Sequence, residues 1–514
     1  MPNDVPAGCT VYGRSGMVVA GHPLAALAGW RALDLGGSVA DAAVAAAAVL
    51  GVALPHATTV GGDLFALVHE AATGRTHVLN ASGPAPAAAR AERFRDGVPQ
   101  DGIASLVVPG AVAGLKALHE RFGLRSWAEA LAPAVAAAED GVPVSGALAA
   151  AIVAYRPLIE RDAALAALLL PGGRPLAEGT LLRQPALAAT LAAVAADGPA
   201  AFYEGRPAHS LGALSAERGG LITAGDLAAF RPEWVEPLSA PYLGLEVRTA
   251  PPNSYGVALL LQLQRLAADA GPQGGPGSVE HFARLIPVGR DALAAAAPYL
   301  ADPAFGGPDV RELLARGAAK GASGWPSGVP GGTAVVSVAD AAGNGVVLIE
   351  SIFTPWGSGV HDPATGILFN NRVRGFAADP AHPNVVAPGK RPAHTLSPAL
   401  ALEDGRLRFL LTTPGGPGQT LTLAQVLVNR IEHGLPLAAA VAQPRWSLDL
   451  AGRLLVEETV PDAVVTGLAQ RGLHAEKAGV ITPYFGSAEL IERLPDGVLA
   501  GVPDRRRDAA AIGA

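Results

Sequence analysis

Val329-Pro330-Gly331-Gly332-Thr333-Ala334-Val335-Val336-Ser337-Val338 is the stretch where the chain changes character most abruptly. Before Thr333 lies a Pro- and Gly-rich segment, and from Thr333 onward runs an apolar, β-branched sequence that is typical of a strand. A second such run, residues 346–351, follows a Gly-Asn-Gly turn. Because an antiparallel hairpin brings the end of its second strand beside the start of its first, we expect Ser351 to lie next to Thr333.

A glycine-rich linker that leads directly into a strand beginning with Thr is what a self-cleaving precursor with an N-terminal nucleophile needs. Gly332 would allow the peptide bond before Thr333 to adopt a strained conformation that other residues resist. A glycine loop before a strand that begins with Thr is also common where no such chemistry occurs. By itself, the stretch therefore favours a purely structural role.

The same stretch belongs to a series of short motifs that extends along nearly the whole chain. The motifs include Gly36-Gly37-Ser38-Val39-Ala40-Asp41, Gly61-Gly62-Asp63, Val108-Pro109-Gly110, Thr354-Pro355-Trp356-Gly357-Ser358-Gly359, Phe369-Asn370-Asn371-Arg372, Pro388-Gly389-Lys390-Arg391-Pro392, Thr413-Pro414-Gly415-Gly416, Gln443-Pro444-Arg445 and Pro503-Asp504-Arg505-Arg506-Arg507-Asp508. In order and spacing they resemble the γ-glutamyltransferase family of N-terminal nucleophile hydrolases. The resemblance implies a large chain, residues 1–332, and a small chain, residues 333–514, that stay associated as one globular unit after cleavage.

Composition and charge exclude several classes of function. The chain has 514 residues, enough for a large core, and a net charge of −7 with one short run, Arg505-Arg506-Arg507, between two Asp residues, which argues against a nucleic-acid partner. We find no run of 18 strongly apolar residues and no secretory signal pattern, so we expect no membrane span. Cys9 alone forms no intramolecular disulfide and no multi-cysteine metal site. These features fit a cytoplasmic protein, and we expect neither metal nor cofactor.

The pattern of expected elements suits a layered α+β sandwich. Its four-layer αββα form, the N-terminal nucleophile hydrolase type, is implied by the resemblance rather than by periodicity. Strands are expected at residues 17–20, 64–69, 76–80, 246–250 and 407–412. Helices are expected from His22-Pro23 to about residue 35, over 41–50, over most of 112–266 and over about 420–432. Alanine-rich stretches at 42–48, 132–138 and 187–196 should be helical because Ala has the highest helix propensity. A linker is expected over residues 313–332.

The resemblance also assigns the catalytic roles. Thr333, freed by cleavage after Gly332, is first the agent of its own cleavage and then the acyl-forming nucleophile, with its α-amine as base. An α-amine has a reference pKa of about 7.7–8.0, which suits that role near neutral pH. Ser351 falls where the family has a supporting hydroxyl, although it could simply end a strand. Gly415 and Gly416 match the oxyanion-hole glycines, although without the other motifs they would indicate a plain turn.

The sequence departs from γ-glutamyl-specific members where those enzymes bind the charged groups of the substrate. Ser82 replaces the Arg that holds the α-carboxylate, and Phe353 replaces an expected Asn. No carboxylate follows Asn371 to bind the substrate amine, and His394 and Thr395 replace paired serines. The site has therefore lost both clamps for a γ-glutamyl group, which removes several charge-assisted hydrogen bonds.

Arg372 places a fork-shaped cation where the family often has an acid, and His394 adds another donor near it. This pattern resembles the branch that contains oxamate amidohydrolase and related acylases. An Arg suits an acyl group that ends in a carboxylate and carries no amine. We therefore expect a substrate-binding set made of Arg372, Asn371, His394, Thr395, Phe353 and Ser82. A structural ion pair is the alternative role for Arg372.

The leading hypothesis is an autoprocessed, heterodimeric hydrolase that cleaves a small-molecule amide through an acyl-Thr333 intermediate. Its acyl group would be small and carboxyl-bearing, like oxamate or a glutaryl group. A γ-glutamyl hydrolase or transferase that acts on glutathione-like donors is the alternative, if other residues supply the clamps. Minor alternatives are an oxalyl C–C bond hydrolase of a secondary-metabolite pathway and a non-catalytic binding protein on this fold. The joint presence of Gly332, Thr333, Ser351, Gly415 and Gly416 argues against the non-catalytic alternative.

Overall fold

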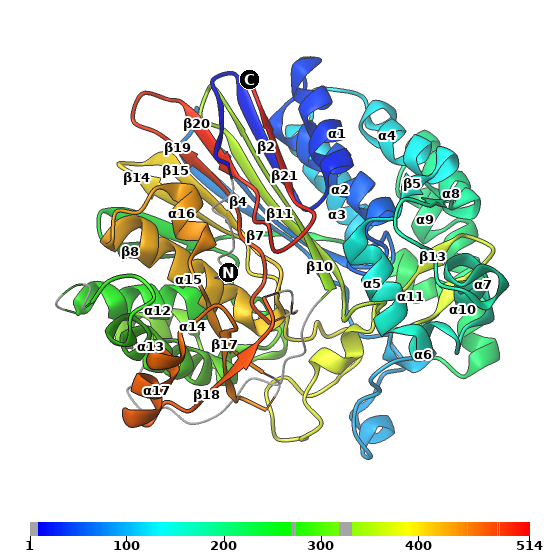
Figure 1. Ribbon diagram of the computed structural model, residues 1–514. Coiled ribbons are helices and arrows are strands. Elements are labelled where there is room, and N and C mark those ends of the chain that lie inside the picture. Colours follow the sequence, from blue (N-terminus) through cyan, green and yellow to red (C-terminus); the bar gives the residue numbers. More distant parts are fainter. Residues whose placement is uncertain are drawn as a thin grey trace.

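Two seven-stranded antiparallel sheets lie face to face in the centre of the molecule (Figure 1). The computed structural model describes residues 9–269, 271, 274–317, 332–449, 451–480, 482 and 484–514. The first sheet has the strand order β21 (Ala510–Gly513), β2 (Gly16–Ala20), β10 (Gly332–Asp340), β11 (Gly345–Phe353), β3 (Asp63–Glu70), β4 (Arg75–Ala81) and β7 (Glu233–Val235). The second has the order β1 (Val11–Gly13), β20 (Leu499–Val502), β19 (Glu489–Arg493), β15 (Arg406–Thr412), β14 (Ala399–Glu403), β9 (Leu245–Thr249) and β8 (Leu238–Tyr242).

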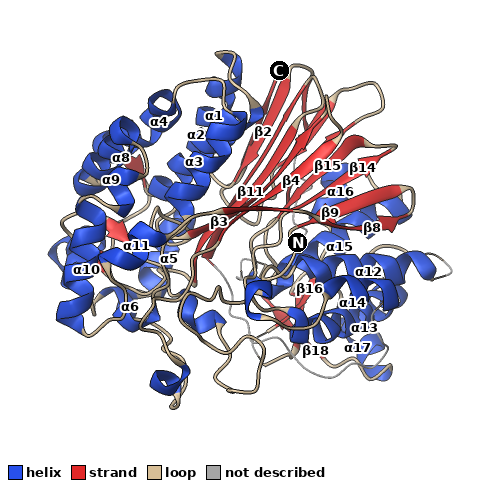
Figure 2. Ribbon diagram, turned by 180° about the vertical axis from the view of Figure 1, so that it is seen from behind, coloured by secondary structure: helices blue, strands red, loops and turns tan. Residues whose placement is uncertain are grey.

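Helices cover the outer face of each sheet, so the molecule has four layers in the order α, β, β and α (Figure 2). On the side of the first sheet lie α1 (Pro23–Asp34), α2 (Val39–Ala53), α3 (Ala111–Phe122), α4 (Trp127–Asp140), α5 (Gly146–Ala154), α6 (Arg156–Ile159), α7 (Ala163–Leu169), α8 (Pro185–Asp197), α9 (Ala200–Tyr203), α10 (Arg206–Arg218) and α11 (Ala224–Ala229). On the side of the second lie α12 (Gly256–Ala268), α13 (Val279–Ala296), α14 (Val310–Arg316), α15 (Gln419–Leu427), α16 (Leu437–Ala442) and α17 (Asp462–Gln470). The predicted α+β sandwich is confirmed.

Three small sheets complete the described structure. They pair β5 (Val142–Pro143) with β6 (Leu181–Leu182), β12 (His361–Asp362) with β13 (Ile367–Leu368), and β16 (Trp446–Leu448) with β17 (Leu454–Glu457), to which β18 (Ala475–Ala478) adds in parallel. Within the described residues, no helix is both long and apolar enough to cross a membrane.

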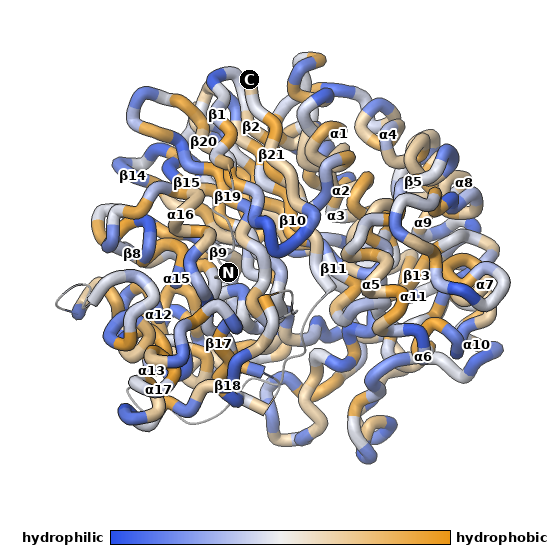
Figure 3. The backbone as a smooth tube through the Cα atoms, viewed as in Figure 1, coloured by the Kyte–Doolittle hydropathy of each residue, from blue (hydrophilic) through white to orange (hydrophobic). Residues whose placement is uncertain are grey.

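The hairpin of β10 and β11 is buried on both of its faces, which explains its continuous apolar sequence. Val336 and Val338 pack into the core between the first sheet and its helices. Val335, which alternates with them, packs into the core between the two sheets. Figure 3 shows the apolar residues concentrated along these central strands and along the helix surfaces that face them. The hairpin is thus held from both sides, and the position of Thr333 is fixed with it.

Helix α2 lies directly against this hairpin and is buried along all 15 of its residues. Ser38 caps its first turn by accepting from the N–H groups of Ala40 and Asp41, and the Asp41 carboxylate accepts in return from the Ser38 N–H. An apolar helix rich in Ala can approach a sheet and its neighbouring helices closely, which is why it tolerates burial on every side. Its C-terminal end leads to His56 and Ala57 beside Gly332.

The structure corrects the predicted linker of residues 313–332. Its first residues belong to α14, because Asp309 caps that helix and the Leu313 side chain packs into the core of the second sheet. Its last residue, Gly332, is already part of β10. Residues 318–331 lie outside the described part of the chain. The predicted helix at 420–432 is α15, which ends at Leu427 and continues as a π-helix over Val428–Glu432.

Candidate active site

The side chains of Thr333 and Ser351 meet where β10 begins and β11 approaches its end. The Thr333 hydroxyl donates to the Ser351 hydroxyl oxygen across 3.4 Å, and the Ser351 hydroxyl donates through a close contact to the carbonyl oxygen of Gly332. The Phe353 N–H donates to the same Ser351 oxygen across 2.8 Å. This short chain of hydrogen bonds runs from the hydroxyl of Thr333 to the carbonyl group immediately before it. It is the arrangement that attack of Thr333 on its own peptide bond requires.

Space, rather than backbone conformation, explains the glycine before Thr333. Gly332 is not among the residues with positive φ. A Cβ at this position would lie only 2.7 Å from the carbonyl oxygen of His56 and 3.1 Å from the Cα of Ala57. The reason that we expected for Gly332, an unusual backbone conformation, is therefore replaced by close approach of the loop after α2.

Backbone strain lies on the other strand of the hairpin, at Phe353. Its φ is 82°, in the left-handed region that non-glycine residues rarely adopt. A bulky residue held in that region costs about 1–3 kcal/mol, and such residues cluster at functional sites. Phe353 pairs with Gly332 across the sheet, and the register shifts between Gly332 and Ala334. The irregular geometry is thus concentrated at the junction with Thr333.

A loop of the second sheet brings Gly415 and Gly416 towards the same region. The loop follows β15 and precedes α15, and its Pro414 lines a pocket together with Thr333. Gly415 has φ of 126° and Gly416 has φ of 58°, so both adopt conformations that favour glycine. Within the described residues, neither of their N–H groups donates to a protein acceptor. Two free donors in a glycine turn are suited to a developing oxyanion.

Arg372 is fully buried, at 0% exposure, on the β3 side of the hairpin. Its Nε donates to the Asp63 carboxylate across 2.9 Å, and its guanidinium carbon lies 4.2 Å from the centre of the Phe353 ring. The two terminal nitrogens, Nη1 and Nη2, have no hydrogen-bond partner in the described structure. Arg372 therefore forms the structural ion pair that was the alternative role, yet it keeps two donors unused.

His394 contacts Asp63 rather than lying free. Its Nε2 donates to the Asp63 carboxylate across 3.2 Å, and its Nδ1 accepts from the Leu396 N–H across 3.4 Å. Burial, with the charge of Arg372, lowers the pKa of His394 to about 4, so the ring is neutral near pH 7. Although burial opposes it, the hydrogen bond from His394 and the charge of Arg372 hold the pKa of Asp63 below its ordinary value. Asp63 is therefore an ionised carboxylate held by Arg372 and His394.

The remaining predicted substrate residues are buried close to these groups, and the polar atoms of two of them are already engaged. Ser82 donates to the Asn80 side chain across 2.6 Å and accepts from the amide of Asn253. The amide of Asn371 donates to the Thr354 hydroxyl across 2.7 Å and also to a main-chain oxygen. Thr395 is 3% exposed, and its carbonyl oxygen accepts from a serine hydroxyl. Ser82 and Asn371 thus shape the surroundings of Arg372 rather than offering free donors.

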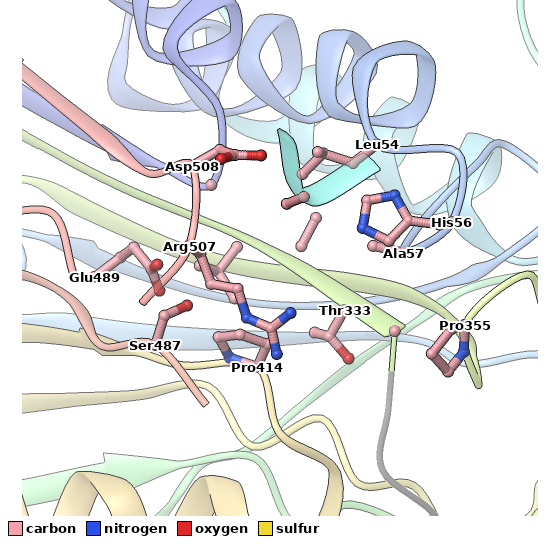
Figure 4. A pocket seen from close by; sticks show the side chains of 15 residues that line it. Leu54, His56, Ala57, Thr333, Pro355, Pro414, Ser487, Glu489, Arg507 and Asp508 are labelled. Carbon is pink, nitrogen blue, oxygen red and sulfur yellow. The ribbon is translucent and has the colours of Figure 1, made fainter. Parts of the chain in front are cut away.

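A pocket opens at Thr333, and Figure 4 shows its lining, to which Arg372 does not belong. It is formed by Gly21 after β2, by the loop after α2 and by the segment that leads into β21. That segment contributes Arg507, whose guanidinium group points towards Thr333 and Pro414. Sequence reasoning used residues 503–508 only as a family motif and missed Arg507. The run of three arginines was the available signal, but it did not show which of them faces the pocket.

Two packed sheets between helical layers, with a buried threonine at the start of a central strand, define the class of N-terminal nucleophile hydrolases. The sequence profile of the gamma-glutamyltranspeptidase family matches residues 25–514. The chain therefore belongs to the gamma-glutamyltranspeptidase family and is an enzyme of this hydrolase class, amidohydrolase or γ-glutamyltransferase-like.

The chain is similar to named relatives over nearly its whole length. Acylase ACY 1 proenzyme of Pseudomonas sp. (strain SE83) is 36% identical over 97% of this chain and 94% of the relative. Oxamate amidohydrolase proenzyme of Klebsiella pneumoniae subsp. pneumoniae is 35% identical over 97% of this chain and 98% of the relative. The crystal structure of cephalosporin acylase from Bacillus halodurans has a TM-score of 0.91 and 32% identity, covering 100% of this chain and 99% of the other.

Proposed function

We propose that the protein is a precursor that cleaves itself between Gly332 and Thr333 and then hydrolyses amides through an acyl-Thr333 intermediate. The observation that carries this proposal is the hydrogen-bond chain from the Thr333 hydroxyl through Ser351 to the carbonyl oxygen of Gly332. In it, Ser351 accepts from the nucleophile and donates to the carbonyl that is attacked. Two relatives that are named as proenzymes support the same conclusion.

In the cleavage step, Thr333 Oγ1 attacks the carbonyl carbon of Gly332 and the peptide C–N bond breaks. The resulting ester is hydrolysed by water, which leaves residues 1–332 and 333–514 as two chains in one globular unit. The two chains would stay together because β10 of the second chain pairs with β2 of the first, and β11 pairs with β3. The freed α-amine of Thr333 then acts as the base for its own hydroxyl.

In turnover, Thr333 attacks the carbonyl of the substrate and expels the amine, and water then releases the acid. Gly415 and Gly416 would donate their free N–H groups to the oxyanion of each tetrahedral intermediate. The loss of one such donor typically costs about 2.7–4 kcal/mol of transition-state stabilisation. Ser351 would keep the hydroxyl of Thr333 oriented, as it does before cleavage.

For the acyl group of the substrate, we propose a small acid such as an oxamyl or glutaryl group. The two unpartnered terminal nitrogens of Arg372 are suited to a carboxylate, because they can donate to it in a fork. A γ-glutamyl group also carries an ammonium, which needs a free carboxylate. Asp63, the carboxylate that contacts Arg372, already accepts from Arg372, His394 and the Gly83 N–H. An acyl group without an amine therefore fits this side better.

Two variants of Thr333 and a panel of amides test the proposal. Thr333→Ala should stay uncleaved and inactive but folded, because the hydroxyl needed for both steps is gone. Thr333→Ser should be cleaved and keep part of its activity, because it loses only a methyl group. The unaltered enzyme should hydrolyse oxamate or glutaryl 4-nitroanilide in preference to γ-glutamyl 4-nitroanilide.

Cleavage after Gly332 in the Thr333→Ala variant would refute the assignment of the nucleophile. Efficient turnover of glutathione by the unaltered enzyme, above that of the amine-free amides, would instead establish the γ-glutamyl alternative.

A further inference from the structure

The order of strands in the first sheet gives Thr333 two different sides. In this sheet β10 lies between β2 and β11. Strands β11 and β3 are therefore on one side of β10, and strands β2 and β21 are on the other. Asp63 begins β3, and Arg372 binds it on the first side. Arg507 precedes β21 on the second side and lines the pocket that opens at Thr333. Arg507 thus lines the pocket of Thr333, whereas Arg372 lies on the β3 side of the hairpin, against Asp63 and Phe353.

Arg507 differs from its two neighbours in the arginine run. Arg506 is buried and uses all three guanidinium nitrogens, in contacts with Glu457, Asp504 and main-chain oxygens. Arg505 is exposed. Arg507 is only partly buried, and its side chain has no hydrogen bond or ion pair with any residue that the structure describes. A guanidinium group with five donors, directed into a pocket and left without a partner, is suited to an anionic ligand.

The pocket wall around Arg507 carries two further polar groups that are buried and unused. Glu489 is 0% exposed, and neither of its carboxyl oxygens has a partner in the described structure. The hydroxyl of Ser487, 1% exposed, has none either. Burial raises the pKa of Glu489 well above its ordinary value, and the charge of Arg507 opposes that rise. The Ser487 hydroxyl is therefore a further donor beside Arg507, and burial disfavours the ionised form of Glu489 that would compete for the guanidinium group.

The other carboxylates near Arg507 do not occupy its donors. Asp504 is bound to Arg445 across 2.6 Å and to Arg506 across 3.1 Å. Asp508 lines the same pocket, and Figure 4 shows its carboxylate on the far side from the guanidinium group of Arg507. Burial, with the charges of Arg507 and His22, lowers the pKa of His56 to about 3, so this histidine of the lining is neutral.

We propose that Arg507, with Glu489 and Ser487, forms a subsite for a carboxylate on the amine that the reaction releases. An amide extends in opposite directions from the carbonyl carbon that Thr333 attacks. The proposed function places the acyl end of the substrate against Arg372. With the substrate in that orientation, the amine end enters the pocket of Arg507. Arg507 would thus set the preference for the released amine.

Matched anilides separate the two carboxylates. Glutaryl-4-nitroanilide and glutaryl-3-carboxy-4-nitroanilide differ only in a carboxylate on the leaving amine, and the two pentanoyl anilides lack the acyl carboxylate. We expect Arg507→Ala to lower kcat/KM about ten- to hundredfold for the 3-carboxy anilides, the size of a lost charge-assisted hydrogen bond, through a higher KM. The 4-nitroanilides should be nearly unaffected. Arg507→Lys should restore part of the loss, and Arg505→Ala, an exposed neighbour, is the matched control.

Three outcomes would overturn the subsite: equal losses on both leaving groups, a loss that follows the acyl carboxylate instead, or no loss. Binding of 5-amino-2-nitrobenzoate, the released amine, to the processed enzyme gives a second test by calorimetry. Its Kd should rise by the same factor in Arg507→Ala, whereas binding of 4-nitroaniline should not change. This binding measurement needs no turnover. If no glutaryl anilide were hydrolysed, the proposed acyl group would be refuted, but the two Kd values would still test the role of Arg507.

Discussion

Arg372 and Arg506 are both buried beside carboxylates, but they use their donors in opposite ways. Arg506 bonds through all three of its nitrogens to Glu457, Asp504 and main-chain oxygens. Arg372 bonds to Asp63 through Nε alone, and its two terminal nitrogens have no partner in the described structure. Arg506 connects the segment before β21 to Glu457, the last residue of β17. Arg372 lies over the ring of Phe353, the residue that pairs with Gly332.

The difference has a physical meaning because a buried donor without a partner is costly. An unsatisfied polar group costs about 1–3 kcal/mol, and more if it is charged. A site whose only purpose is stability has no reason to keep two such donors. Arg506 therefore has the geometry of a structural residue, and Arg372 has that of a residue whose partner is a ligand.

The largest effect that follows from this comparison is on stability. Arg506→Met should destabilise the folded protein by about 3–5 kcal/mol, because it leaves Glu457 without the arginine that it contacts inside the protein. Thermal and denaturant midpoints of the Thr333→Ala background, in which the chain stays intact, measure this loss against Arg505→Met. The ratio of kcat/KM between glutaryl and pentanoyl anilides, measured in the cleavable protein, should not change. A change in that ratio with unaltered stability would contradict the structural role.

The next effect distinguishes the surroundings of Arg372 from those of Arg506 by their response to pH. Asp63, the partner of Arg372, is also bound by His394, whereas the side-chain partners of Arg506 are Glu457 and Asp504. The folded pKa of His394, about 4, lies below its value of about 6.5 in the unfolded chain. Its contribution to stability is therefore complete above pH 6.5 and is lost as the pH falls towards 4. A pKa difference of this size corresponds to at most about 3 kcal/mol.

His394→Gln keeps a donor for Asp63 but does not titrate. The stability of this variant relative to its parent should therefore increase as the pH falls. Thermal midpoints of the intact background with and without this substitution, from pH 7.5 to 4.5, test the expectation. Replacing the exposed His474 in the same way should leave the profile unchanged. Parallel profiles for His394→Gln and its parent would mean that His394 does not titrate in this range.

The smallest of the three effects is selective and concerns the substrate. Arg372→Ala should lower kcat/KM for glutaryl-4-nitroanilide by a factor that corresponds to about 1.5–3 kcal/mol, the value of hydrogen bonds to a charged group. The loss on γ-glutamyl-4-nitroanilide should be much smaller, because the cation that opposes its ammonium is removed at the same time. Equal losses on the two anilides would make Arg372 as structural as Arg506.

Local sequence was sufficient to predict the hairpin and the contact that it makes. Strand periodicity and a glycine turn placed Ser351 beside Thr333, and the structure has their hydroxyl oxygens 3.4 Å apart. The sandwich followed from the alternation of strands and helices together with the family motifs. Alanine-rich helices were predictable too, because their propensity agrees with their burial.

Long-range contacts were not predictable from one sequence. Asp63 and Arg372 are 309 positions apart, and the bridge between Gly61 and Phe369 brings their segments together. The sequence showed a cation without a carboxylate after it, so the partner of Arg372 was missed. Arg507 was missed for the same reason, because its place beside Thr333 depends on how the end of the chain returns to β2. Gly332 was identified, but the crowding that requires it comes from the distant His56 loop.

Cleavage between Gly332 and Thr333 is the event on which the proposed chemistry of Thr333 depends. Intact-mass measurement and N-terminal sequencing of purified protein, before and after prolonged incubation at neutral pH, test it. We predict two chains that correspond to residues 1–332 and 333–514, with Thr333 as the new N-terminus, and one uncleaved chain for Thr333→Ala. A single intact chain that nevertheless hydrolyses amides, or cleavage at any other bond, would contradict the account.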